Sequence, residues 1–97
     1  MSILVCKMYG YELRKSVEKI FFKLVKKDRV LFNIIERKIG EIVLNPNHYK
    51  NLRKPLQYLK RVHIGKSHVL CFSVDENRKV VVFEKFGHHD KIYSVRN

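Results

Sequence analysis

The chain has 97 residues, 45% of them hydrophobic, and its 21 Lys and Arg outnumber its 9 Asp and Glu to give a formal net charge of +12. This length supports one modest core, so we expect a single domain over residues 1–97. The hydrophobic content excludes a disordered chain, and no apolar run approaches the length of a membrane span.

The excess of positive charge indicates a polyanionic partner. Charges act over roughly 8 Å at physiological salt, so nucleic acid is the first candidate, an acidic protein the second, and no membrane partner is expected. The two cysteines, Cys6 and Cys71, form no Cys-x-x-Cys pair, which predicts reduced thiols in a cytoplasmic protein. His88, His89 and Asp90 have no third ligand at a familiar spacing, so no metal or other cofactor is expected.

The N-terminal half predicts one strand and two helices. Residues 3–8 are apolar and β-favouring, and predict a first strand. Helical spacing follows, with Asp28 as the candidate N-cap of a second helix and Asn45-Pro46-Asn47 at its end. Because few residues separate the helices, we expect an antiparallel pair. The first apolar stripe is Leu13, Val17, Ile20, Phe21 and Leu24, and the second is Leu31, Ile34, Ile35, Ile39, Ile42 and Val43.

The C-terminal half predicts three strands. After a basic loop the hydrophobic period becomes two, over residues 58–64, 68–74 and 80–86. Gly65-Lys66-Ser67 and Asp75-Glu76-Asn77 predict the turns between them. The resulting fold class is α+β, in the order β-α-α-β-β-β, with a two-helix hairpin on one face of a small, mainly antiparallel sheet. Because the last run is apolar on both sides, it predicts a central strand.

Positive and titratable side chains follow this predicted sheet. Alternation puts Val62 on one face and both Arg61 and His63 on the other, which the helices leave uncovered. His68 opens the next strand, and we expect it to lie across from Arg61 and His63. These residues predict a rigid basic platform for a phosphodiester chain.

Residues 59–70 (LKRVHIGKSHVL) and 87–93 (GHHDKIY) carry a more specific pattern. A basic-apolar-basic strand, a turn with glycine, a second strand and a later Gly-His turn with a following Tyr resemble the RelE/ParE superfamily of toxins. The resemblance covers nearly the whole chain in element order. It implies that the chain is the toxin of a toxin–antitoxin system and cleaves mRNA on the ribosome as a metal-independent endoribonuclease.

The resemblance also implies the site residues. Arg61 and His63 match the two basic positions of the strand, and His68, His88 and Tyr93 match further catalytic positions. His63, His68 and His89 stand where a cationic side chain is usual. Apart from the resemblance, we expect the nearby cations to bind flanking phosphates of the RNA, so the RNA-binding positions are Arg53, Lys54, Lys60, His89 and Lys91.

Cleavage by the 2′-hydroxyl of RNA needs a base, cations around the phosphate and an acid for the leaving oxygen. Imidazole, with an ordinary pKa of about 6.5, suits either proton-transfer role. We assign Arg61 and His68 to the phosphate, and His63 or His88 to proton transfer. Tyr93 would orient the substrate or donate a proton.

Two other functions stay open at this point. A ParE-like toxin would inhibit DNA gyrase and cleave nothing, and a degenerate relative would only bind its antitoxin. The partners implied are a cognate acidic antitoxin, the ribosome with its mRNA, and operator DNA only through the antitoxin complex.

Overall fold

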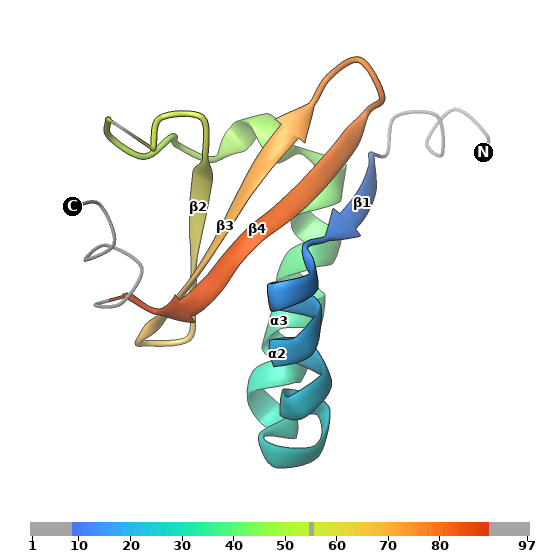
Figure 1. Ribbon diagram of the computed structural model, residues 1–97, viewed down its shortest axis with the longest axis vertical. Helices are drawn as coiled ribbons and strands as arrows, with labels where there is room; N and C mark the ends of the chain where they lie inside the picture. The colour runs from blue at the N-terminus through green and yellow to red at the C-terminus, as the bar shows by residue number, and fades with distance from the viewer. Residues whose placement is uncertain (1–8, 55, 90–97) are drawn as a thin grey trace.

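The computed structural model describes residues 9–54 and 56–89. Within these ranges the α+β class and the predicted order of elements are confirmed (Figure 1). The first strand predicted at residues 3–8 lies outside the described residues. The elements are β1 (Gly10–Leu13), α2 (Lys15–Lys27), α3 (Arg29–Leu44), the short 3-10 helix η1 (Pro46–His48), β2 (Lys60–Ile64), β3 (His68–Asp75) and β4 (Val80–His88).

The four described strands form one mixed sheet in the order β1-β4-β3-β2. β2, β3 and β4 are an antiparallel meander, while β1 runs parallel to β4 at its other edge. The prediction of a central final strand is therefore confirmed. The assignment of Leu13 to the first helix was wrong, because Leu13 pairs with Phe83 as the last residue of β1.

The two helices form the expected hairpin and pack on one face of the sheet (Figure 1). Asp28 is the residue between them, and its Oδ1 accepts a hydrogen bond of 3.1 Å from the backbone N–H of Leu31. The predicted N-cap is thus confirmed, and α3 ends just before Pro46 as expected. In the described part of the chain, neither helix is long and apolar enough to cross a membrane.

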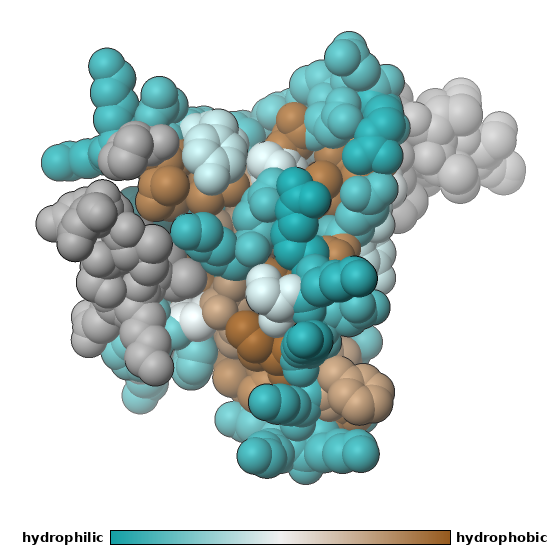
Figure 2. Space-filling view, in the orientation of Figure 1, coloured by the Kyte–Doolittle hydropathy of each residue, from teal (hydrophilic) through white to brown (hydrophobic). Residues whose placement is uncertain are grey.

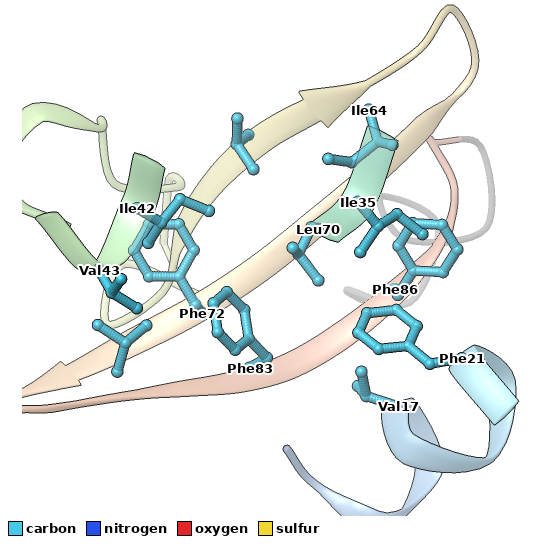
Figure 3. Close-up of a cluster of buried hydrophobic side chains, with 12 residues drawn as sticks. Val17, Phe21, Ile35, Ile42, Val43, Ile64, Leu70, Phe72, Phe83 and Phe86 are labelled. Atoms are coloured by element: carbon cyan, nitrogen blue, oxygen red, sulfur yellow. The ribbon is translucent and has the colours of Figure 1, made fainter. Parts of the chain in front are cut away.

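The main core fills the space between the helix pair and the sheet (Figure 3). Phe21 of α2 meets Phe86 of β4 edge to face, with ring centroids 5.6 Å apart. Burial of these side chains is the main force that holds the hairpin on the sheet. The buried members are Val17, Phe21, Ile35, Ile42, Val43, Val62, Ile64, Leu70, Phe72, Val81, Phe83 and Phe86.

A second, smaller cluster lies on the opposite face of the sheet, called the open face below. Leu59, Val69 and Cys71 are buried there. Leu52 and Leu56, from the loop before β2, pack against them. The loop therefore covers part of a face that the sequence predicted to be bare.

Candidate functional site

β2 places two site residues on the open face, as its alternation predicts. Val62 is in the main core, whereas Arg61 is half-buried and His63 exposed. In the antiparallel register Arg61 lies opposite Cys71 and His63 opposite Val69. Since directly opposite residues share a face, both side chains stand on the side of the smaller cluster.

β4 adds a cation that the sequence reasoning missed. Phe72 pairs with Phe83, but the next pair is Cys71 with Lys85, so Glu84 is an extra residue in β4 at this point. Such a β-bulge reverses which face the following residues use. Without it, Lys85 would point toward the helices, as Phe83 does. With it, Lys85 shares the open face with Cys71.

Arg61 and Lys85 therefore flank Cys71 from the two neighbouring strands. Their backbones are two strand spacings apart, about 10 Å, a gap that long side chains can bridge over the thiol. Burial raises the pKa of Cys71 to about 11, and the nearby charges of Lys85 and Arg61 oppose that rise only in part. Cys71 is thus a buried, unreactive thiol between two cationic side chains.

Glu84, an acidic residue on the same face, is held by hydrogen bonds within the fold. Arg14, which precedes α2, donates from Nε to Oε1 of Glu84 at 2.8 Å, and Ser73 Oγ donates to Oε2 at 2.8 Å. Burial alone would raise the pKa of Glu84, but these hydrogen bonds hold it below its ordinary value. The carboxylate accepts its hydrogen bonds from Arg14 and Ser73, and the charge of Lys85 is the smallest of the influences that lower its pKa.

His68 and His88 lie on the other side of the sheet. The expectation that His68 faces Arg61 and His63 was wrong, because the register puts Ile64 opposite His68 and His68 opposite His88. The His68 ring stacks on the core residue Phe86, with centroids 5.4 Å apart and planes 5° apart. His68 and His88 meet edge to face at 6.0 Å.

His89 follows the end of β4 beside this pair. Its ring stacks on that of His88 at 4.7 Å, and its backbone N–H donates to the carbonyl of Ser67 at 2.9 Å. His63, His68 and His88 therefore lie near one end of the sheet, but on its two sides, and Arg61 stands two residues further from that end than His63. Tyr93 and Lys91 lie outside the described residues.

Of the remaining basic positions, two are exposed to solvent and one makes hydrogen bonds within the fold. Arg53 and Lys54 are exposed on the loop that covers the smaller cluster. Lys60 lies opposite Phe72, on the helix side, and its Nζ donates to the carbonyl of Tyr49 at 3.2 Å and to Oδ1 of Asn51 at 3.1 Å. Lys60 thus fastens the loop to β2. Across residues 9–54 and 56–89, no group of three or more His, Cys, Asp or Glu is arranged to hold a metal ion.

Comparison with known proteins decides the family. No family model matches the chain. The putative toxin RelE4 of Methanocaldococcus jannaschii is 55% identical over 86 residues, which cover 89% of this chain and 92% of that protein. The chain belongs to the RelE family of toxins. It is therefore the toxin component of a toxin–antitoxin system.

Solved structures support the fold of this RelE-family toxin. The RelBE2 toxin–antitoxin complex of Mycobacterium tuberculosis contains a chain with a TM-score of 0.69 and 21% identity, over 84% of this chain and 98% of that one. A mutant of the E. coli toxin RelE in the free state has a TM-score of 0.68 and 17% identity, over 92% and 94%. At these identities the likeness shows the fold alone.

Proposed function

We propose that this RelE-family toxin is an endoribonuclease that cleaves mRNA in the ribosome, without a metal. The observation that carries the proposal is the pair of cations on the open face, Arg61 and Lys85, with His63 beside them on β2. Residues two apart on a strand are about 6.8 Å from each other. An imidazole at that distance can reach a hydroxyl of a nucleotide whose phosphate is bound between the cations.

In the proposed reaction, the 2′-oxygen attacks the adjacent phosphorus and the bond from phosphorus to the 5′-oxygen breaks. His63 takes the proton of the 2′-hydroxyl, and a second group gives a proton to the 5′-oxygen. Arg61 and Lys85 stabilise the charge on the pentacoordinate phosphate. The products are a 2′,3′-cyclic phosphate and a free 5′-hydroxyl.

The second proton-transfer group and the RNA-binding positions remain predictions from the sequence. His88 and Tyr93 are the candidates for the acid. Arg53, Lys54, His89 and Lys91 would bind flanking phosphates. For His68 and Lys60 the contacts described above favour supporting roles, since the former stacks on the core and the latter fastens a loop.

The partners follow from this function. The basic surface suits a cognate acidic antitoxin that covers Arg61 or displaces the C-terminal segment with Tyr93, and operator DNA would be bound only through that complex. Ribosomes and mRNA as targets place the action of the toxin in the cytoplasm.

Primer extension on an mRNA under translation tests the proposal. We expect cleavage only when ribosomes are present, undiminished by a chelator, with the cyclic phosphate left on the upstream fragment. Intact mRNA together with full arrest of translation would contradict it.

A second candidate is a toxin that binds its target and cleaves nothing, as a ParE-like gyrase inhibitor would. The separation of His68 and His88 from Arg61 by the sheet favours this reading, because a binding protein does not need those groups to converge. Double-strand breaks that depend on gyrase, with mRNA left intact, would select it.

A further inference from the structure

Helix α2 presents a row of exposed cations that the candidate site does not use. The helix contains five lysines and a single acid, Glu18. The buried residues Val17 and Phe21 face the sheet, and at 100° per residue the lysines fall on the opposite side of the helix. The lysine row, as we call it, is Lys15, Lys19, Lys23, Lys26 and Lys27, all of them exposed.

The spacing within the lysine row works against the helix that carries it. Lys15, Lys19 and Lys23 follow one another at i, i+4, where like charges repel and destabilise a helix. Lys15 also opens the first turn, where the helix dipole disfavours cations, and no side chain caps that end. Lys26 and Lys27 stand in the last turn, where the dipole favours cations, and Lys26 Nζ lies 5.5 Å from the centre of the Phe22 ring. For Lys15, Lys19 and Lys23 the helix offers only one acid, Glu18 in the first turn.

The neighbouring helix shows the usual arrangement instead. On α3 cations alternate with acids, and Lys38 Nζ pairs with Glu41 Oε1 at 3.3 Å. Among the ion pairs that join described residues, none includes a lysine of α2. A polyanion bound from outside would supply the negative charge that the lysines of α2 lack.

The lysine row is straight and starts one residue after Arg14, which contacts Glu84, and from there it follows α2 away from the sheet. From Lys15 to Lys27 it rises about 18 Å, in steps of about 6 Å for each four residues. Figure 1 shows the helix pair projecting beyond the edge of the sheet, and Figure 2 shows hydrophilic side chains over that end of the molecule. A fixed line of point charges suits a fixed line of phosphates, as along one edge of an RNA double helix.

An acidic amphipathic peptide fits this region less well. The apolar pocket beside the lysine row, about 250 Å³ in volume, is lined by Tyr11, Phe22 and Phe32 but also by two acidic residues, Glu18 and Glu36. A peptide that buried its apolar side there would bring its own acids against them. The phosphate backbone needs no apolar pocket.

We propose that the lysine row is a second nucleic-acid surface, which binds the backbone of double-helical RNA and so docks the toxin on folded RNA. The proposal rests on the proposed function in so far as the ribosome supplies such RNA. It concerns binding alone, and no group of the row takes part in cleavage.

The test compares two variants with the same reduction in charge. One carries Lys15→Gln, Lys19→Gln and Lys23→Gln in the row, and the control carries Arg29→Gln, Arg37→Gln and Lys38→Gln on α3. The probe is a blunt RNA duplex of mixed sequence, titrated at several salt concentrations. For each lysine that no longer binds a phosphate, the slope of log K against log salt should fall by about 0.7–0.9.

For the row variant we expect the salt dependence to become shallower, with the magnitude of the slope smaller by about 2. Its affinity at low salt should fall at least tenfold, and the control should change much less. Equal changes in both variants would overturn the proposal, since net charge would then explain the binding. It would also be overturned if the row variant kept its affinity for the duplex and bound more weakly only to vesicles containing anionic lipid or to a poly-glutamate peptide.

Folding and cleavage are followed separately. The melting temperature of the row variant should not fall, because the substitutions remove like-charge repulsion. If the wild-type toxin cleaves no mRNA but binds the duplex through the row, only the proposed function fails. If it cleaves mRNA and both variants bind the duplex equally, only the lysine row fails.

Discussion

Lys85 and Arg61 lie on either side of the buried Cys71, on the face of the sheet that the helices leave open. The relationship depends on one inserted residue, Glu84, which turns the last part of β4 over. Arg14 and Ser73 hold the Glu84 carboxylate in place. The bulge thus turns Lys85 to the open face, while the carboxylate of Glu84 is hydrogen-bonded to Arg14 and Ser73.

Lys85→Gln should reduce mRNA cleavage by roughly 10²-fold, the usual effect of removing one charged donor to a transition state. The exposed Arg37 of α3 offers the matched control, because Arg37→Gln removes the same charge far from the site. Initial rates on translated mRNA measure both variants. Equal rates for the two would remove Lys85 from the site.

Glu84→Gln should destabilise the fold by about 1 kcal/mol at neutral pH, the usual worth of a part-buried, charge-assisted hydrogen bond after discounting for the exposed Arg14. The pKa of Glu84 is below its ordinary value of 4.5 in the folded state. Its contribution is therefore complete above that value and is lost as the pH falls through the folded-state pKa.

Urea unfolding at pH 7 and at pH 3.5 measures this difference. The difference in the free energy of unfolding between wild type and Glu84→Gln should be smaller at pH 3.5 than at pH 7. The control is Glu36→Gln, at an exposed position of α3. A gap that stayed constant with pH would mean that the Arg14 contact contributes nothing.

Cys71 should resist thiol reagents while the protein is folded, since burial raises its pKa to about 11 and shields it from solvent. The measurement uses a Cys6→Ser background, so that only one thiol is counted. We expect no reaction with a disulfide reagent at pH 8 within minutes, and full reaction in urea. Rapid, stoichiometric labelling of the folded toxin would show that the loop above Cys71 opens readily.

Asp28→Ala should cost about 1 kcal/mol in the free energy of unfolding, because the N–H of Leu31 loses its cap. Asp28→Asn keeps the acceptor oxygen and should restore most of that stability. Thermal unfolding of both variants checks the pair. Equal destabilisation by Ala and Asn would point to the charge rather than the hydrogen bond.

Much of this fold could be predicted from local patterns. The period of 3.6 residues predicted both helices, Asp28 marked the junction, and the period of two placed Arg61 and His63 on the open face. β1 escaped notice because Gly10–Leu13 is a short edge strand of mixed polarity that pairs with the distant β4.

The site was predicted less well, for reasons of register. A strand shifted by one residue exchanges its faces, and the sequence does not state which residue lies opposite His68. The pairing of Ile64 with His68 across the turn decides it. The bulge at Glu84 gave no signal either, so Lys85 looked like one more residue after an apolar run.

The comparison of His63→Gln with His68→Gln in ribosome-dependent mRNA cleavage tests the central claim most directly, because the two imidazoles stand on opposite sides of the sheet. We predict that cleavage falls by about 10²-fold or more for His63→Gln and by less than about threefold for His68→Gln. A large fall for His68→Gln with nearly full activity for His63→Gln would place the chemistry on the helix side and contradict the account.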